Sequence, residues 1–588
     1  MKAGSILFLA VSIIRMTNNI RIFLWLGLAL ALWINYSQWQ QDYAPKPTPA
    51  ASATSAVPGT DAPSLDDTVP QAAQADAAPA AAVDAVPTAG VVETSDAAQP
   101  AAQAAAGKVH VTTDVLVLDI DLKGGTLVRA ELPGYPLVKG QPEPVILLNQ
   151  DSPTSNYSLQ TGLAAPEKTA GARPTHVAMF GSAADKYALA AGQDELRVPL
   201  TWTDGNGITV TKTFVFHRGM FAIGLEQEIH NASAAPWAAA SYARISRVDP
   251  KLERSMFKVE SFAYRVPAIY DPSGKKYQKL DIEKTENQNL SLKVQNGWLA
   301  GIQHHFTSAI VPDPTKTYAY TLRAEGRHYI LGALGPVVTV APGATVVLKE
   351  GLFVGPKLQK QLETLHPELS RVADYGLLTP LSKPLFWLLG FLHSLVKNWG
   401  FAIILATFLL KLAFYPLSEK AGRSMARMRA LAPRMKLLQE TYKDDRSKLG
   451  QATMELYKTE KVNPLAGCLP MIIQMPVFLA FYWVLLESAE MRQAPFFGWI
   501  NDLSSRDPFF ILPALNGLAM WLQYKLNPPP PDPMQAKIFQ FMPLVFSVMF
   551  ALFPAGLVLY WVTNTGLSIL QQWNINRKIA IEDKARRK

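Results

Sequence analysis

The chain has 588 residues, of which 49% are hydrophobic and only 18% are charged, and its formal net charge is +9. Such a low proportion of charged residues is unusual for a soluble protein, and the length leaves room for several domains. The single cysteine, Cys468, excludes an intramolecular disulfide.

The apolar residues gather in runs of about twenty, which is the length that a transmembrane helix needs. Six such runs are predicted to span a membrane: 22–38, 398–417, 467–487, 509–524, 538–553 and 555–574. The first run follows a basic start and lies within residues 1–42, which we interpret as an uncleaved signal anchor. Met16 is a second plausible start within this region.

Residues 43–106 consist largely of Ala, Pro, Ser, Thr and Asp and contain almost no aromatic residues. A segment of this composition cannot bury enough apolar surface to offset the entropy lost on ordering. It is therefore predicted to be a disordered tether.

Residues 107–356 show a different pattern, in which β-branched and aromatic residues alternate with polar ones, as in "ITVTKTFVFHR". Turn signals such as "DGNG" and "DPSG" separate the alternating runs. Many short strands without long helical patterns predict a β-sandwich, and the length suits one large domain of two sheets.

Residues 357–397 include the apolar stretch "GLLTPLSKPLFWLLGFLHSLV", which is interrupted by two prolines. We interpret this region as an interfacial amphipathic helix that lies along the membrane surface. It precedes a helical core at 398–575, which contains the last five predicted spans.

Residues 418–465, between the second and third spans, are predicted to form a basic helical hairpin, and Pro433 is expected to kink its first arm. The positive charge of the hairpin has two readings. It is either a solvated face that sets topology, or a docking surface for a ribosome, a targeting receptor or anionic lipid. Apolar residues recur along the first arm at spacings of three and four, as in an amphipathic helix: Met425, Met428, Leu431, Met435 and Leu438.

The distribution of Lys and Arg predicts the orientation in the membrane. The basic hairpin and the basic tail at 576–588 are expected in the cytoplasm, whereas the more acidic loop 488–508 is expected outside. With six spans, both termini are then cytoplasmic and the β-domain lies outside.

Lys411 is an unusual residue for an apolar span, because a lysine near the centre of a spanning helix costs about 2.5–3.5 kcal/mol. One reading is that its long side chain reaches the cytoplasmic headgroups. The other is that it faces a wet cavity, because Thr407 and Tyr415 lie four residues to either side and form a polar stripe with it.

Other predicted spans carry matching polar residues, namely Gln474 in the third and Tyr560, Trp561 and Asn564 in the last. Interhelical hydrogen bonds explain each of them singly. Together with Lys411 they predict a hydrophilic pocket in the cytoplasmic half. Since 398–417, 538–553 and 555–574 contain no Asp or Glu, the lysine is suited to receive an acidic group.

Motifs for catalysis are not found. His304 and His305 form the only paired histidines, and on a strand their rings would point to opposite faces, so no metal site is predicted. No glycine loop for phosphate binding is present, and neither a cofactor, an enzymatic activity nor specific nucleic-acid binding is expected.

Long stretches of the C-terminal part resemble one family. "ATFLLKLAFYPL", "VNPLAGCLPMIIQMPVFLAFYWVL" and "DPMQAKIFQFMPLVFSVMFALFPAGLVLYWVTN" are similar to the YidC/Oxa/Alb family of membrane protein insertases, over residues 376–575. The tether and outer β-domain resemble its Gram-negative form. The resemblance implies five core helices around a groove that is open to cytoplasm and lipid. It also implies a periplasmic β-supersandwich domain similar in fold to sugar mutarotases.

The resemblance also implies a function, which is to insert and help fold nascent inner-membrane proteins, alone or with the Sec translocon. The implied substrate helix leaves the groove past an apolar exit face of Phe478, Met549 and Phe550. Two residues depart from the family pattern. Lys411 replaces the usual arginine, which keeps the charge but loses the five-donor fork, and Trp561 stands where some relatives have tyrosine.

One alternative function belongs to another class. A secondary transporter of a small anion would also use Lys411, as its binding charge. Transporters usually show internal repeats, and the second half of this chain does not resemble the first.

Overall fold

The structure is a computed structural model that describes residues 107–152, 155–166, 171–249, 265–284, 287–442, 445–460, 469–526 and 533–587. The predicted signal anchor and tether lie outside the described residues. By its contacts the described chain divides into two units: residues 420–460 form one, and the strands and the other helices form the second.

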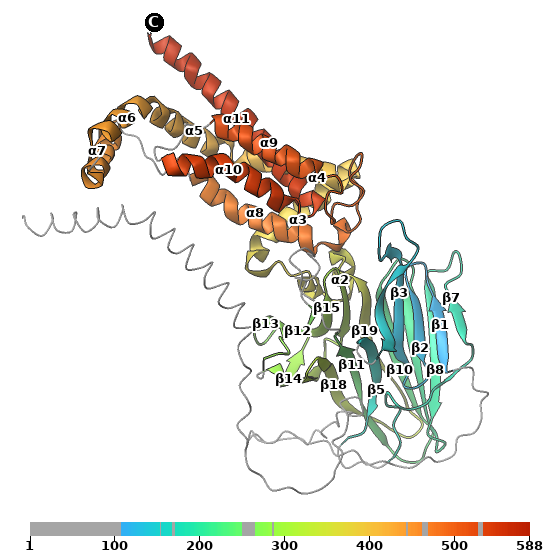
Figure 1. The fold of residues 1–588 in the computed structure, drawn as a ribbon. Helices are drawn as coiled ribbons and strands as arrows, with labels where there is room; N and C mark the ends of the chain where they lie inside the picture. Colours follow the sequence, from blue (N-terminus) through green and yellow to red (C-terminus); the bar gives the residue numbers. More distant parts are fainter. Residues whose placement is uncertain are drawn as a thin grey trace, which may run out of the picture. The chain divides into compact units, whose positions relative to one another are not determined.

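The described strands form two sheets, as the two-sheet prediction requires (Figure 1). One sheet has ten strands in the order β14-β17-β18-β11-β5-β4-β3-β2-β1-β7, and the other has nine in the order β13-β12-β15-β16-β19-β10-β9-β8-β6. All neighbours are antiparallel except β1 and β7. The strands are β1 (Lys108–Thr112), β2 (Val117–Asp121), β3 (Thr126–Pro136), β4 (Pro144–Ser152), β5 (Ser155–Ala164), β6 (Gly181–Ser182), β7 (Lys186–Ala188), β8 (Glu195–Thr203), β9 (Ile208–His217), β10 (Ala222–Asn231), β11 (Trp237–Val248), β12 (Arg265–Asp271), β13 (Lys276–Lys279), β14 (Asn289–Gln295), β15 (Trp298–Gln303), β16 (Phe306–Val311), β17 (Thr317–Glu325), β18 (His328–Val340) and β19 (Thr345–Pro356).

Alternation along the strands explains why the two sheets pack face to face. In β8, Val198, Leu200 and Trp202 point inward and are buried, whereas Glu195 and Arg197 are exposed. Successive side chains of a strand point to opposite faces, so one apolar face per sheet suffices to build a core. Residues of both sheets meet in a single apolar cluster, which confirms the β-sandwich.

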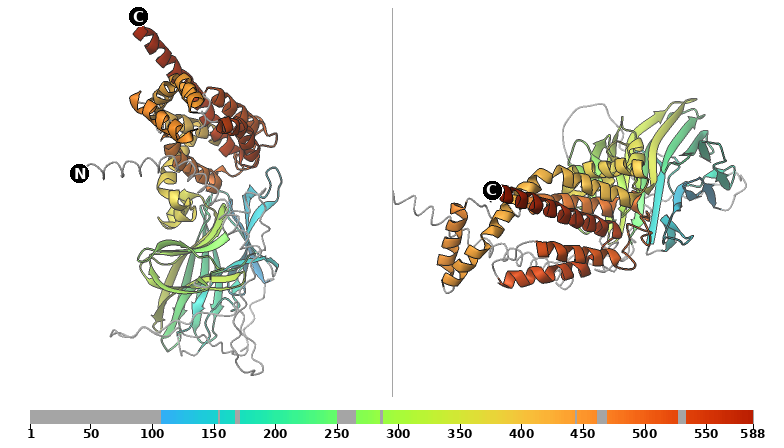
Figure 2. Two further views of the ribbon diagram at one scale, coloured as in Figure 1. Left: turned by 60° about the vertical axis from the view of Figure 1, so that its left-hand side comes forward. Right: turned by 90° about the horizontal axis from the view of Figure 1, so that it is seen from above.

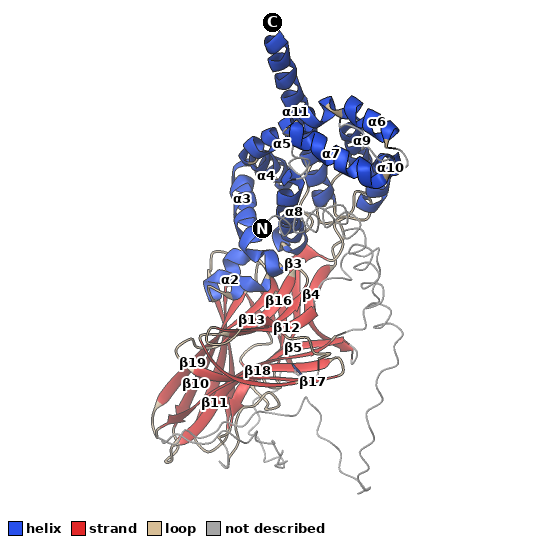
Figure 3. Cartoon of the chain, turned by 90° about the vertical axis from the view of Figure 1, so that its left-hand side faces the viewer, coloured by secondary structure: helices blue, strands red, loops and turns tan. Residues whose placement is uncertain are grey.

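The helices follow the strands along the chain, as the colours of Figure 2 show, and Figure 3 distinguishes the helices from the strands by colour. They pack into a second apolar core in which α3 contacts α4 and α8, and α11 contacts α4, α8 and α9. The longer helices are α2 (Gln359–Leu365), α3 (Thr379–Val396), α4 (Trp399–Ala413), α5 (Tyr415–Ala430), α6 (Ala432–Thr441), α7 (Arg446–Thr459), α8 (Leu469–Glu487), α9 (Ile511–Leu526), α10 (Pro533–Phe550) and α11 (Ala555–Arg587).

The α3 helix occupies the region predicted to be interfacial. Its buried face, with Leu385, Leu389 and Leu392, packs into the helical core. Trp387 and Phe391 stack on each other on the exposed side. The exposed side of α3 therefore presents large apolar groups.

The predicted span 398–417 is not a single helix. It breaks at Phe414, between α4 and α5. Pro416 accounts for the break, because it has no N–H to donate to Leu412 and it disfavours helical geometry in the preceding residue. Tyr415 therefore does not extend the face of α4 that carries Thr407 and Lys411, and the prediction of one continuous polar stripe is wrong.

Within the described residues, no helix taken singly combines the length and the apolar character needed to cross a membrane. The two segments 399–413 and 415–424 meet these criteria jointly, with a bend of 60° between them.

The hairpin unit contains a break at Leu431, and Pro433 lies in the first turn of α6, where a missing N–H costs nothing. The predicted kink is thus a helix boundary. Asp445 caps α7 by accepting from the backbone N–H groups of Ser447 and Lys448. An ion pair between Arg434 and Glu460 connects α6 to the residue that follows α7.

The orientation of β19 can be tested by a pair of substitutions. Leu352 is fully buried, whereas Val347 on the same strand is 42% exposed. Leu352→Ala is expected to lower the free energy of unfolding of the β-domain by about 2–5 kcal/mol. Val347→Ala is expected to change it by no more than about 0.5 kcal/mol. Urea unfolding of the purified full-length protein measures both, and equal losses would contradict this orientation.

Candidate functional site

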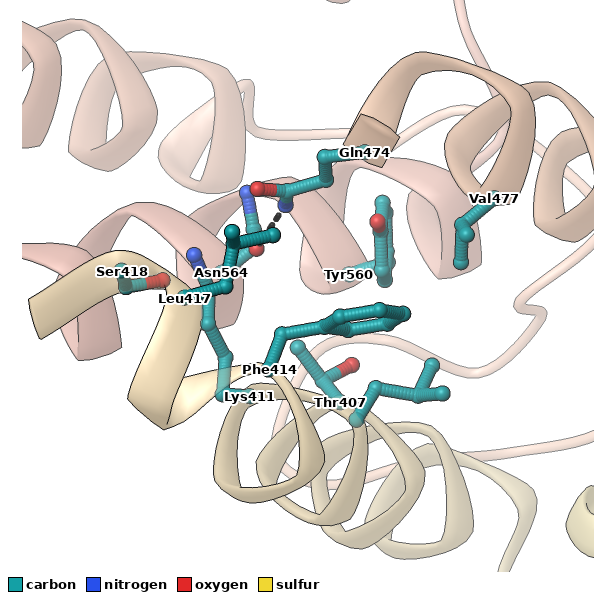
Figure 4. Close-up of a pocket in the computed structure, with 10 residues that line it drawn as sticks. Thr407, Lys411, Phe414, Leu417, Ser418, Gln474, Val477, Tyr560 and Asn564 are labelled. Atoms are coloured by element: carbon teal, nitrogen blue, oxygen red, sulfur yellow. Dashed lines mark hydrogen bonds between the residues drawn. The ribbon is translucent and has the colours of Figure 1, made fainter. Parts of the chain in front are cut away.

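A pocket lies between α4, the first turn of α5, α8 and α11 (Figure 4). The space in and around it that protein atoms do not fill is about 470 Å³, open solvent included. Apolar and polar side chains share its wall: Thr407, Leu410, Lys411, Phe414, Leu417, Ser418, Gln474, Val477, Tyr560 and Asn564.

Lys411 lies in the last turn of α4 and extends toward α11, where its Nζ donates to Ser568 Oγ at 2.8 Å. The Ser568 hydroxyl in turn donates to the carbonyl oxygen of Asn564 at 2.7 Å. Among the described residues Lys411 forms no ion pair. An ammonium group carries three donors, so the bond to Ser568 leaves donors for a further acceptor in the pocket.

The other polar residues of the pocket are fixed by their neighbours. Gln474 Nε2 on α8 donates to Asn564 Oδ1 on α11 at 2.6 Å, which connects two walls of the pocket. The Thr407 hydroxyl donates to the carbonyl oxygen of Ile403, one turn earlier on its own helix, at 2.7 Å. The Tyr560 ring stacks on Phe481, with 4.6 Å between the centroids. The pocket is therefore preorganised.

The structure brings five of the six predicted groove residues together, since Lys411, Thr407, Gln474, Tyr560 and Asn564 all line the pocket. Trp561 is not part of the lining. Its ring packs on Phe478 at 4.8 Å and on Phe550 at 5.3 Å between centroids.

Tyr415 lies outside the pocket lining because the chain turns at Phe414. Its hydroxyl accepts a hydrogen bond from Asn574 Nδ2 at 3.2 Å and contacts Lys578. Tyr415 therefore joins α5 to the C-terminal part of α11.

The three residues expected on an exit face have different surroundings. Met549 is exposed and Phe478 is half-buried. Phe550 is only 2% exposed and packs between Phe546, Phe553 and Trp561, so it does not lie on an open surface, contrary to the expectation.

Several lining residues were not predicted, namely Leu410, Phe414, Leu417, Ser418 and Val477. Phe414, Leu417 and Ser418 reach the pocket because the helix breaks there. Pro416 is the signal in the sequence that could have placed this break.

The paired histidines lie in the turn between β15 and β16, so the prediction that their rings point to opposite faces is wrong. The rings of His304 and His305 stack with 3.7 Å between centroids. Burial lowers the pKa of His304 to about 4 and holds that of His305 well below its usual value.

Comparison with known proteins defines first the class of protein. Residues 391–583 match the family described as 60Kd inner membrane protein, and residues 108–388 match the YidC periplasmic domain. The chain is thus a bacterial inner-membrane protein with a periplasmic β-sandwich domain.

Curated relatives define the family more narrowly. The chain is 44% identical to the membrane protein insertase YidC of Thioalkalivibrio sulfidiphilus, over 96% of this chain and 99% of the relative. It is 43% identical to that of Nitrosococcus oceani, over 96% and 100%. A solved structure of an active YidC insertase aligns with 18% identity and a TM-score of 0.36, over 80% of this chain and 92% of that one. At 43–44% identity over nearly the whole length, the chain belongs to the YidC family of membrane protein insertases.

Water access to the pocket can be tested with cysteines introduced into a Cys468→Ser background, which removes the only native thiol. Leu410 lines the pocket, whereas Ala406, one turn earlier on α4, is fully buried. Leu410→Cys is expected to react with a small charged maleimide, because a thiol forms its reactive thiolate only where water reaches it. Ala406→Cys is expected to react at least about tenfold more slowly. Equal rates in membrane vesicles would contradict a hydrated pocket.

Proposed function

We propose that this chain inserts nascent membrane proteins through the pocket around Lys411. The observation that carries the proposal is an ammonium group inside a preorganised pocket, with no ion-pair partner among the described residues. A short acidic or polar segment of a substrate enters the pocket from the cytoplasmic side and replaces part of the hydration that Lys411 would otherwise need.

The pocket lowers the barrier to translocation in two ways. Its polar wall of Lys411, Gln474, Asn564 and Ser418 shortens the apolar distance that the substrate's polar segment crosses. Its positive charge attracts an acidic segment, and this attraction is stronger in a small pocket walled by protein than in bulk water.

The substrate itself supplies the driving force. Burial of an apolar helix in lipid contributes about 25 cal/mol per Å² removed from water. Where the outer tail is acidic, the membrane potential adds about 2.3 kcal/mol per charge for each 100 mV. No nucleotide is required in this scheme.

The substrate helix then leaves sideways into lipid. Met549, which is exposed, and the half-buried ring of Phe478 are suited to contact it along this exit. Trp561 contacts Phe478 and, together with Phe550, stabilises that side of the pocket from within.

The proposed topology follows the basic residues. The hairpin and the C-terminal end of α11 face the cytoplasm, where a ribosome or targeting receptor delivers substrate, and the β-domain is periplasmic. Cooperation with the Sec translocon for larger substrates belongs to the same proposal.

Substitution of Lys411 tests the charge directly. Lys411→Arg is expected to preserve insertion, Lys411→Ala to slow it more for substrates with acidic outer tails, and Lys411→Glu to be worse still, because like charges repel. The measurement is protease protection of a single-span substrate whose tail carries no, one or two aspartates, in liposomes that contain the purified protein.

The same liposomes separate the alternatives. A Lys411→Ala penalty that does not grow with tail charge would show that the lysine is not a charge receptor. Uptake of a small anion without substrate insertion would favour the transport function over insertion.

The role of the basic hairpin is tested at its exposed charges. Arg427 and Lys436 are exposed, whereas Arg434 pairs with Glu460 and helps to hold the hairpin together. The double variant Arg427→Gln, Lys436→Gln is expected to reduce cross-linking to ribosomes at least about threefold at low salt, because such contacts weaken with screening. Unchanged cross-linking would indicate that these charges serve topology alone. Glu460→Gln, which breaks the ion pair and keeps the basic residues, is the control for loosening of the hairpin.

A further inference from the structure

The end of the β-domain contacts the C-terminal end of α8, which we call its outer end, through a buried ion pair. Lys357 directly follows β19, and Glu487 is the last residue of α8. The Nζ of Lys357 lies 2.9 Å from Oε2 of Glu487, and the two side chains are only 1% and 8% exposed. A buried charge is costly unless it is paired, so each residue depends on the other.

Glu487 is the carboxylate that accepts the hydrogen bond of Lys357, and Glu490 is a second carboxylate close enough to act on it. Burial raises the pKa of Glu490 to about 7, and one of its carboxylate oxygens accepts a hydrogen bond from the backbone N–H of Gln359. Burial also keeps His304 and His305 uncharged near neutral pH, so they add no positive charge beside Lys357. The backbone N–H of Lys357 donates to the carbonyl oxygen of His305 at 2.8 Å, which fixes the lysine at its base.

A second contact holds the residues that follow α8. Lys139, in the loop between β3 and β4, donates through Nζ to the carbonyl oxygen of Gln493 at 2.6 Å. Arg492 donates to the carbonyl oxygen of Pro136, at the end of β3, at 2.9 Å. The β-domain therefore holds this outer loop at two places.

The α8 helix, whose outer end these contacts hold, also forms part of the pocket wall. Gln474 and Val477 of α8 line the pocket, and Phe481 stacks on Tyr560 between these residues and the outer end. Pro476 interrupts α8 between Gln474 and Val477, so the stretch from Val477 to Glu487 is the part that moves as one element. Val477 lies ten residues before Glu487, roughly 15 Å along a helix. A shift at the outer end therefore displaces Val477 at the pocket wall.

We propose that Lys357 is a positioning residue for insertion, and that by pairing with Glu487 it fixes the outer end of α8 and thereby the wall of the pocket. The β-domain then contributes to insertion through the contacts at its end rather than through a ligand site of its own. The effect on insertion rests on the proposed function, whereas the effect on pocket geometry does not.

The test is a double-mutant cycle of Lys357→Met, Glu487→Met and the double variant, each in the full-length Cys468→Ser, Leu410→Cys background. Each single variant removes the hydrogen-bonded partner of a buried charge, whereas the double variant leaves a neutral apolar contact. Lys349→Met is the matched control, because Lys349 lies on β19 and forms an exposed ion pair with Glu226.

Two quantities are measured at equal protein level: maleimide reactivity at position 410, and insertion of a single-span substrate with a neutral tail, which does not depend on the charge of Lys411. Each single variant is expected to change both rates by at least about threefold, and the double variant and Lys349→Met to resemble the parent. If only the Lys411 variants behave contrary to expectation, the change in maleimide reactivity at position 410 still supports the role of Lys357. The two proposals can therefore fail independently.

Single variants that label and insert like the parent would overturn the proposal, and so would a double variant as defective as the singles. If a single variant does not accumulate in cells, the amounts of protein in the parent, the single variants and the double variant are compared instead. Recovery in the double variant then supports the pairing, and no recovery overturns it.

Discussion

A positive charge held among apolar helices is the constraint on which the core of this protein depends. An ammonium group costs several kcal/mol in such surroundings unless polar atoms accept its hydrogen bonds. Ser568 on α11 supplies one acceptor for Lys411 on α4, so the hydrogen bond also connects these two helices. The pair Gln474 and Asn564 connects α8 to the same face of α11. The residues that make the pocket polar are therefore the residues that hold its walls together.

The aromatic residues on the adjoining side have a complementary role. Phe481 stacks on Tyr560, which lines the pocket, and Phe478 packs on Trp561, so rings whose geometry tolerates little change support the lining from behind. Phe550, which is buried behind Trp561, supports this arrangement from the interior. A polar pocket beside a group of packed aromatic rings suits a substrate whose leading segment is polar and whose following helix is apolar.

The β-domain and the helical core each have their own apolar core, and the contacts between them include a buried ion pair and hydrogen bonds from side chains to backbone carbonyls. This division explains how a large β-sandwich can affect a pocket in the helices through the contacts at its end. The Lys357–Glu487 pair and the hydrogen bonds of Lys139 and Arg492 all involve the end of α8 or the loop after it. A domain joined by a few specific contacts can fix a helix end without contributing to the site.

Much of this protein was determined by the sequence itself. Alternation in strands such as β8 predicts the two-sheet domain, because a half-buried strand needs one apolar face. The polar residues in apolar runs predict Lys411, Gln474, Tyr560 and Asn564 as a group, because each is costly in lipid unless it meets the others. Long motifs carry the family resemblance, which the comparisons confirm.

Only the tertiary structure decided the remaining points, because they depend on where the chain turns and on what covers each residue. The break at Phe414 removes Tyr415 from the face of Lys411 and brings Leu417 and Ser418 to the pocket. Helical periodicity could not predict this, because it assumes a straight helix and Pro416 does not permit one. Phe550 is buried by Phe546, Phe553 and Trp561, so its burial depends on where the chain turns between α10 and α11. The pairing of Lys357 with Glu487 joins residues 130 positions apart, and no local pattern encodes such a contact, because its energy comes from a burial that exists only in the folded protein.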